Sequence, residues 1–363
     1  MRVLMLTPTV DLADRLNTGF AHGWVKALAR HVEHVDVLCR VAGLMDLPSN
    51  VTVTGLDNEL NTSRLKLLLA FHQAIGRRIR DVDVVFAHFI PPYVLAAAPS
   101  AKLHGVPLIH WNANKITHMQ MRLAHLLANR IVTATPDSYP FSGPKVTVIG
   151  HGVDFDLFAP AKRSLETGRI VVTVGRLTPS KNLELQVEAA ALLLKKPGFE
   201  DVIFKAVGDE PWWTDGYCAK LEAYISKLGL AGRFQLSGGR PYAEMASSYQ
   251  EATMMVSTSK SGSLDKVVLE AIGCGLPALV TGRVFEPLLG EDRDLLFAKD
   301  DDPQDLAKRL AQVLSMDPAE RRALGLRLRQ LAIENHSLEH LMTNLVAVFH
   351  EEINRRRRYN AAS

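Results

Sequence analysis

The order of apolar and polar positions along this chain of 363 residues predicts strands that alternate with helices. In the first part of the chain, short apolar runs typical of buried strands occupy residues 2–8, 34–40, 83–89, 107–111, 129–135 and 145–152. A helical pattern spans residues 20–31, and further helical patterns separate several of the strands. Because strands that alternate with helices form βαβ units, we expect a parallel sheet here.

The same pattern begins again after the polar stretch at residues 159–168. Strands are expected at 169–177, 201–211, 233–239, 253–259 and 277–282, and helices at 182–196, 217–230, 242–252, 303–316 and 337–358. The chain is therefore predicted to be α/β, with two doubly wound, Rossmann-like domains in tandem that face one another across a cleft. Open α/β sheets bind ligands at the carboxyl ends of their strands, near the point where the strand order reverses.

Composition narrows the class of protein without naming a function. Hydrophobic residues make up 47% and charged residues 22%, a globular balance, and no apolar run approaches the roughly 20 residues of a membrane span. The segment after Arg2 is too short for a signal peptide, and three widely spaced cysteines favour a reducing compartment, so we expect a cytoplasmic protein. Histidine and cysteine spacing matches no zinc motif, so no metal site is expected.

Charge is distributed unevenly between the two halves. Residues 1–155 carry 15 Lys and Arg against 11 Asp and Glu, whereas residues 156–363 carry 27 against 28. This asymmetry suggests that the first domain faces something acidic. The excess is too small to favour nucleic acid as a partner.

The segment VGRLTPSKNL, residues 174–183, places two cations after a buried strand and before a helix. Arg176 offers paired donors and Lys181 a point charge, which suits an anion at the carboxyl edge of a parallel sheet. Taken alone, two solvated loop cations would be the more common explanation, because charged residues are mostly exposed.

The segment SKSGSLDKVVLEAIGCG, residues 259–275, supplies a second set of residues suited to binding the same anion. Its small residues Ser261, Gly262 and Ser263 let a ligand approach the backbone, and the N-terminus of the following helix can bind phosphate. Glu270 lies inside that helix among apolar neighbours, and its carboxylate suits the vicinal hydroxyls of a ribose. A surface glutamate is the alternative, but apolar residues surround this position on nearly every side. Together the features predict a nucleotide site.

These motifs resemble those of a known family, the retaining glycosyltransferases of family 4, or glycosyl transferases group 1, which have the GT-B fold. The resemblance rests on VGRLTPSKNL, on VGDEP, on RFQLSGGRPYAEMASSYQEATMMVSTS and on LDKVVLEAIGCGLPALVTG, with VIGHGVDFDLF as the segment that ends the first domain. It is close in the C-terminal half and loose in the N-terminal half. It implies an acceptor-binding domain at 1–155, a nucleotide-sugar-binding domain at 156–336, and a C-terminal helix at 337–363 that packs back on the first domain.

The resemblance also implies an activity and a set of site residues. It implies transfer of a sugar from a UDP- or GDP-sugar with retention of anomeric configuration, without a metal, to a glycan, lipid-linked or small-molecule acceptor. Arg176 and Lys181 would hold the diphosphate, Glu270 the ribose, and the loop at Arg240 the base. The resemblance assigns catalysis to Arg176, Lys181, His110 and Asn114, and donor binding to Gly19, Gly208, Arg240, Ser261, Gly262, Ser263, Leu264, Asp265, Lys266 and Glu270.

Several positions depart from the family pattern. The family often has a second glutamate eight positions before Glu270, where this chain has Gly262, and Phe20 stands where a second glycine is expected. A histidine common in the family corresponds to Asn114, with His110 slightly earlier. Two alternatives stay open, and the departures at Gly262 and Asn114 motivate the first of them. One is a nucleotide-binding but catalytically silent subunit, and the other is a nucleotide-sugar epimerase or a sugar phosphorylase of the same fold.

Residues 63–81 predict a basic amphipathic helix, with Leu65, Leu68, Leu69, Ile75 and Ile79 on one face. Such a helix can lie on an anionic membrane, although packing against a core is the more common explanation. We therefore expect contact with a carbohydrate or lipid-linked acceptor and, as a hypothesis, peripheral contact with an anionic membrane, assisted by Arg355–Arg358.

Overall fold

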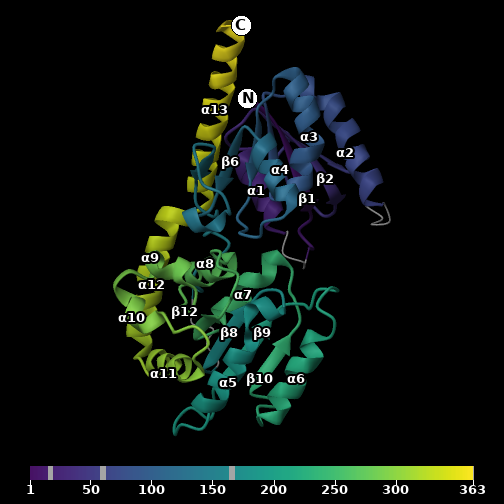
Figure 1. Cartoon of the computed structure of the whole chain (residues 1–363). Coiled ribbons are helices and arrows are strands. Elements are labelled where there is room, and N and C mark those ends of the chain that lie inside the picture. Colours follow the sequence, from purple (N-terminus) through teal and green to yellow (C-terminus); the bar gives the residue numbers. More distant parts are fainter. Residues whose placement is uncertain (15–18, 58–62, 163–167, 363) are drawn as a thin grey trace. The chain divides into compact units, whose positions relative to one another are not determined.

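The computed structural model describes residues 1–14, 19–57, 63–162 and 168–362. Within these ranges the chain forms two compact units. The first unit contains residues 1–14 and 19–152 together with the C-terminal residues from Leu338 onward, and the second contains Val153–Ser337. The C-terminal helix thus belongs to the first unit although it follows the second in sequence (Figure 1).

The first unit is built on a parallel sheet of seven strands in the order β3-β2-β1-β4-β5-β6-β7. Its strands are β1 (Arg2–Val10), β2 (His34–Ala42), β3 (Val51–Gly55), β4 (Val84–His88), β5 (Leu108–Trp111), β6 (Arg130–Thr133) and β7 (Val146–Val148). The strands expected from the apolar runs are all present, and β3 is an additional edge strand. The order reverses between β1 and β4, which is therefore the switch point of this sheet.

Helices cover both faces of this sheet. They are α1 (Phe20–Leu28), α2 (Arg64–Arg78), α3 (Pro91–His104), α4 (Met119–Leu127) and α13 (Leu338–Ala362). Leu341, Met342, Leu345 and Phe349 of α13 are buried in the same apolar cluster as Trp24 of α1 and the sheet residues beneath. The face of the last helix that carries these apolar side chains therefore anchors it to the first unit.

Helix α2 divides into two halves along its length. Phe71 and Ile75 in its second half are buried, as packing against a core requires, and Ile79 just beyond it is buried too. Leu65 and Leu69 in its first half are exposed. Among the described residues, no helix combines the length and the apolar character that crossing a membrane demands.

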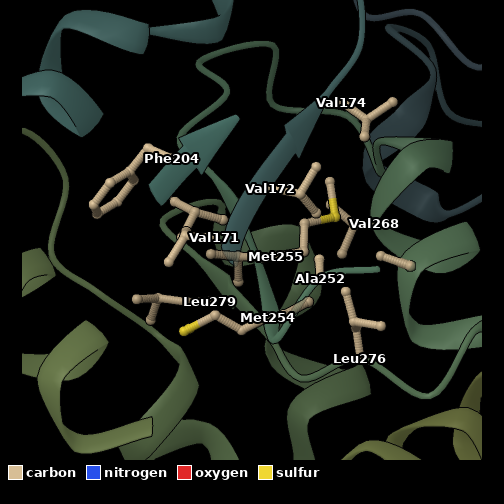
Figure 2. Close-up of a cluster of buried hydrophobic side chains, with 14 of the residues drawn as sticks. Val171, Val172, Val174, Phe204, Ala252, Met254, Met255, Val268, Leu276 and Leu279 are labelled. Atoms are coloured by element: carbon tan, nitrogen blue, oxygen red, sulfur yellow. The ribbon is translucent and has the colours of Figure 1, made fainter. Parts of the chain in front are cut away.

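The second unit is built on a parallel sheet of five strands in the order β10-β9-β8-β11-β12. The strands are β8 (Ile170–Val174), β9 (Ile203–Val207), β10 (Phe234–Ser237), β11 (Met254–Ser257) and β12 (Ala278–Val280). Every strand pair in both sheets is parallel, which confirms the expected α/β class. Figure 2 shows the apolar side chains of β8, β11 and their neighbours packed in its core.

The larger helices of the second unit are α5 (Leu183–Leu193), α6 (Tyr217–Lys227), α7 (Met245–Gln250), α8 (Lys266–Gly273), α11 (Pro303–Leu314) and α12 (Pro318–His336), with the short α9 (Glu286–Leu289) and α10 (Arg293–Leu296). The strand order reverses between β8 and β11. The loop after β8 and the loop after β11 therefore meet at the switch point, where open α/β sheets hold their ligands.

Candidate functional site

An ion pair joins the two loops at the switch point of the second sheet. Nζ of Lys181, from the loop after β8, lies 2.7 Å from Oδ2 of Asp265, the N-cap residue of α8. The two side chains are 22% and 12% exposed, so the pair is sheltered but still reachable from solvent. The backbone N–H of Lys260 also donates to the carbonyl of Ser180 at 2.9 Å, which ties the loops together a second time.

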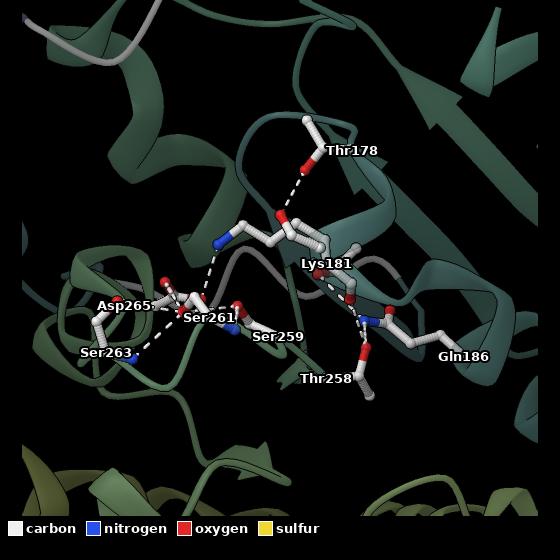
Figure 3. A network of polar contacts seen from close by, with 10 residues as sticks. Thr178, Lys181, Gln186, Thr258, Ser259, Ser261, Ser263 and Asp265 are labelled. Carbon is white, nitrogen blue, oxygen red and sulfur yellow. Dashed lines mark hydrogen bonds and ion pairs between the residues drawn. The ribbon is translucent and has the colours of Figure 1, made fainter. Parts of the chain in front are cut away.

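Small polar residues surround this pair, as Figure 3 shows. Ser261 Oγ contacts Asp265 Oδ1 at 3.5 Å and accepts hydrogen bonds from the Ser259 hydroxyl at 3.1 Å and the Ser263 hydroxyl at 3.2 Å. Gly262 has a φ of +66°, a left-handed conformation that favours glycine. Glycine at this position therefore shapes the loop, in addition to leaving out the carboxylate that the family pattern has there.

The position of Lys181 is fixed by its backbone. Thr258, at the end of β11, donates its hydroxyl toward the carbonyls of Lys181 and Asn182 at 2.8 and 2.9 Å, and Gln186 donates to Thr258 Oγ1 at 2.9 Å. Gln186 and Thr258 are both buried, so this bracing is shielded from water. The backbone that carries the Lys181 side chain is consequently held at the sheet edge by interactions that do not use the charge of the ammonium.

Two glycines give the loops after β8 and β9 room to approach. A Cβ on Gly208 would lie 1.9 Å from the carbonyl oxygen of Gly175, far inside any allowed contact. A Cβ on Gly175, whose φ is +132°, would lie 3.4 Å from Cε of Lys181. Gly208 therefore has a structural reason to be glycine, because it lets the loop after β9 pack against the backbone of the loop after β8.

Arg176 lies at the rim of the same loop and is exposed. Its guanidinium lies over the Trp213 ring at 5.8 Å from the centroid. The neighbouring Trp212 is 86% exposed, which is unusual for a tryptophan. Stacking on Trp213 orients the arginine, while its donors stay available to an anion.

Glu270 sits in a second, more deeply buried cluster one turn farther along α8. It is 3% exposed, and Oε2 accepts a hydrogen bond from the Tyr249 hydroxyl at 3.1 Å. The Tyr242 hydroxyl also donates to this carboxylate. Lys266 lies one helical turn before Glu270, with its ammonium 5.7 Å from the centre of the Tyr242 ring. The carboxylate is thus already occupied by partners of the chain itself.

Burial shifts the ionisation of every group in this cluster. It raises the pKa of Glu270, and the Lys266 ammonium and the two tyrosine hydroxyls oppose that rise. Burial also lowers the pKa of Lys266 to about 8, with Glu270 and Asp154 acting in the other direction. The pKa of each tyrosine is raised, chiefly by burial, so both hydroxyls remain protonated donors.

Arg240 lies apart from the ion pair, in the loop after β10. Its Nη1 donates to Ser247 Oγ at 2.9 Å. The backbone N–H of Gly239 donates to Asp209 Oδ1 at 2.7 Å, which fixes this loop against the loop after β9. Leu264 is buried in the core and contributes packing beneath the serine loop.

The remaining predicted residues belong to the first unit. Gly19 is buried at the N-cap of α1 and has a helical φ of −55°, so its backbone does not require glycine. Asn114 is exposed, and its side-chain oxygen accepts from the Ile116 N–H at 2.9 Å.

His110, the other catalytic candidate in this segment, is enclosed by the sheet. It lies within β5 and is 0% exposed, and burial lowers its pKa to about 3. A neutral ring that is buried within the sheet agrees with a packing role. Of the two candidates in this segment, Asn114 is the one that faces solvent.

Sequence reasoning missed the partners that make these sites work. The Lys181–Asp265 contact joins residues far apart in the chain, so no local pattern could indicate it. Tyr242 and Tyr249 lie seven apart in a segment expected to be one helix, but the structure places Tyr242 in a 3-10 turn before α7, so helical periodicity does not pair them with Glu270. Thr258 and Gln186 carry no signal of their own in the sequence.

Comparison with known proteins finds a match to one family model over most of the second unit. Residues 154–330 match the family model of glycosyl transferases group 1. A D-inositol 3-phosphate glycosyltransferase of Corynebacterium diphtheriae is 28% identical over 269 residues, which are 67% of this chain and 60% of that protein. The enzyme of the same name from Thermobispora bispora is 26% identical over 207 residues, 48% of each chain. The chain spans about half the length of the curated relatives that it matches.

Solved structures share the fold over nearly the whole chain. Sucrose-phosphate synthase from Thermosynechococcus elongatus has a TM-score of 0.78 at 17% identity and covers 100% of both chains. Anabaena HepE in complex with UDP-glucose has a TM-score of 0.77 at 15% identity, covering 97% of this chain and 100% of that one. WaaG, a glycosyltransferase involved in lipopolysaccharide biosynthesis, has a TM-score of 0.69 at 16% identity, covering 96% and 99%. These likenesses establish the fold, which is the GT-B fold.

Proposed function

We propose that the chain transfers a sugar from a UDP- or GDP-sugar to a carbohydrate or lipid-linked acceptor, because residues 154–330 match the family model of the group 1 glycosyl transferases. The observation that carries the proposal is the Lys181 ammonium, braced at the switch point between β8 and β11 beside the N-terminus of α8. A cation and a helix N-terminus at this edge together favour a phosphate group.

The proposed donor diphosphate takes the place of the Asp265 carboxylate on Lys181. Asp265 does not cap α8 with its side chain, so its charge is directed to the lysine. An entering phosphate competes for the same ammonium and also finds Arg176 at the rim. When the bond between the sugar and the diphosphate breaks, the two cations stabilise the charge that develops on the departing oxygens.

Glu270 is proposed to bind the ribose of the nucleotide, which requires a local exchange of partners. Its carboxylate is buried beside Lys266, Tyr242 and Tyr249, so a ribose diol must replace at least one of these contacts. Lys266 and Tyr242 are only partly buried, whereas Tyr249 is fully enclosed, and Lys266 has the longer and more flexible side chain of the two. The proposal therefore assigns the movement to Lys266, with Arg240 near the base. Support comes from Anabaena HepE, whose solved complexes contain UDP and UDP-glucose.

Three parts of the proposal rest on the family resemblance. They are retention of anomeric configuration, independence from metal and the acceptor-binding role of the first unit. Asn114 is proposed to contact the transferred sugar, because it is exposed in the segment where the family has a histidine. The exposed leucines in the first half of α2 support an acceptor that carries an apolar group, and contact with an anionic membrane remains part of the proposal.

The test is release of nucleotide from the donor. The chain is incubated with UDP- and GDP-hexoses and a panel of glycan and lipid-linked acceptors, and NMR follows free nucleotide and the anomeric configuration of the product. We expect release of one nucleotide with an axial product from an axial donor. Lys181→Met should abolish release, whereas Lys227→Met, at an exposed position of α6, should not change it.

A catalytically silent subunit is the second candidate, and Gly262 together with the buried His110 favours it. This candidate predicts that the chain binds nucleotide without releasing it from any donor and acceptor. An inverted product would remove the retaining mechanism, and absence of both binding and release would remove the nucleotide-sugar function.

A further inference from the structure

A basic cleft of about 510 Å³ opens in the first unit, away from the carboxyl ends of the strands. Its walls come from the C-terminal ends of α3 and α4 and from α13, all labelled in Figure 1. Leu108 begins β5, while Asn129 and Lys145 directly precede β6 and β7, and all three line the cleft. It therefore lies at the amino ends of these strands, the edge opposite to the one where such sheets bind substrates.

Among the residues that the structure describes, four cations and no carboxylate line this cleft: Lys102, Lys145, Arg355 and Arg356. Lys145 is used by the fold, because Nζ donates to the carbonyls of Leu126 and Ala128 at 3.1 Å each. Arg355 forms an ion pair with Glu352 at 2.8 Å. The other two cations leave the cleft with a net positive charge.

Lys102 and Arg356 have no acidic partner within the described part of the chain. Lys102 is exposed and forms no side-chain hydrogen bond there. Nε of Arg356 is buried and donates to no acceptor among those residues. This nitrogen lies against the backbone at Gly105, the left-handed residue with a φ of +69° that ends α3. A buried donor without an acceptor is costly, so the geometry favours an anionic oxygen at this place.

Exposed apolar side chains lie at the mouth of the cleft. Leu126 is 69% exposed and Leu127 is 44% exposed, and both line it. Tyr359, on the last turns of α13, is exposed beside an adjoining hollow of about 210 Å³ that also contains Arg355 and Arg356. Cations next to exposed leucines are typical of a surface that meets an anionic membrane.

We propose that this cleft binds the phosphate of an anionic phospholipid headgroup, with Lys102 and Arg356 as its ligands and Leu126 and Leu127 entering the boundary of the acyl chains. The proposal does not depend on the transferase function, because the cleft lies at the other edge of the sheet and its test measures binding. The competing explanation is that these cations only complement the C-terminal ends of α3 and α4, as Lys145 does.

The test is flotation of the full chain with vesicles of phosphatidylcholine alone and of phosphatidylcholine mixed equally with phosphatidylglycerol. We expect binding to the anionic vesicles only. Each cation near the surface contributes about fivefold, so the Lys102→Ala/Arg356→Gln variant should lose roughly thirtyfold. The matched control is Lys196→Ala/Lys227→Ala, which removes the same charge from exposed positions in the second unit and should bind like wild type.

Additional variants and ligands separate lipid binding from misfolding and from binding of a free anion. Lys102→Glu changes an exposed residue and should lose binding while the unfolding temperature is kept, which separates the proposal from misfolding. Leu126→Ser should weaken the binding that persists at high salt. Calorimetry with glycerol 3-phosphate and inorganic phosphate tests for a free anion as the occupant. The proposal is overturned if the two double variants lose binding equally, if neither loses it, or if only the free anions bind.

Discussion

Two pairs of a lysine and a carboxylate lie at the start of α8, and they differ in what surrounds them. Lys181 and Asp265 form a contact of 2.7 Å that solvent can still reach, among serines and a left-handed glycine. Lys266 and Glu270 lie one turn deeper, beside two tyrosines whose hydroxyls bind the carboxylate. The first pair can exchange one anion for another at small cost, whereas the second must break buried hydrogen bonds before it can accept a ligand.

This difference assigns the two pairs different roles in the proposed site. The outer pair is suited to hold and release a diphosphate, because its acidic member is a replaceable anion. The inner pair is suited to select a ligand, because only a group that replaces the lost hydrogen bonds can enter. We therefore expect substitution of Lys181, in the outer pair, to have the largest effect and substitution of Lys266, in the inner pair, the smallest.

The largest effect is expected for Lys181→Met. Removing one group that stabilises the departing diphosphate lowers the rate by about a hundredfold to a thousandfold. Steady-state release of nucleotide from the donor measures this, and a circular-dichroism melting curve checks the fold. A rate within a few fold of wild type would show that the lysine only holds Asp265 in place.

Glu270→Gln should have a smaller effect, a loss of nucleotide affinity that depends on the ribose hydroxyls. Hydrogen bonds to a charged group contribute about 1.5–3 kcal/mol, so UDP or GDP should bind roughly ten to a hundred times more weakly. The sharper measurement compares each nucleotide with its 2′-deoxy form. Wild type should prefer the ribonucleotide and the variant should not. Equal preference in both proteins would assign Glu270 to the structure alone.

Asp265→Asn should act in the opposite direction and by a smaller factor. The variant frees the Lys181 ammonium from its competing anion, so nucleotide should bind about fivefold more tightly, as expected for one partly exposed ion pair. Asp300→Asn, at an exposed position, removes the same charge and serves as the control. If both variants tighten binding equally, the effect comes from net charge and the pair has no special role.

The smallest effect concerns pH and the inner pair. The pKa of Lys266 is lowered to about 8 in the folded chain, so between about pH 8 and the ordinary value of 10.5 the unfolded state binds more protons. Stability contributed by this group therefore rises with pH across that window. Chemical unfolding of wild type and Lys266→Met at pH 7.5 and 9.5 should show wild type gaining relative to the variant. A difference that stays constant would mean that Lys266 titrates as an exposed lysine.

The sequence indicated the strands of both sheets because buried parallel strands read as continuous apolar runs. Two of the elements that the sequence did not predict have a physical reason to be missed. Strand β3 lies at an edge of its sheet and alternates Val and Thr, so it forms no apolar run. Helix α12 is rich in charge, and Gly325 within it packs against the backbone of Gly275, a contact that no periodicity shows.

Single residues of the candidate site could be predicted from the sequence, but the contacts between them could not. Lys181, Ser261 and Glu270 follow from the residue types that end parallel strands and begin helices. The contacts that decide their roles do not, because Asp265 on Lys181 and Tyr249 on Glu270 depend on how distant segments pack. The same limit applies to His110, because its burial inside β5 can be seen only in the folded chain.

The most direct test of the central claim is calorimetric binding of UDP and GDP to wild type, Lys181→Met and Asp265→Asn. The account predicts that one of the two nucleotides binds wild type, that it binds Lys181→Met far more weakly, and that it binds Asp265→Asn more tightly. Opposite shifts from the two members of one ion pair would place the diphosphate on that pair. Equal affinity in all three proteins, or no binding to any of them, would contradict a diphosphate site at the junction of β8 and β11.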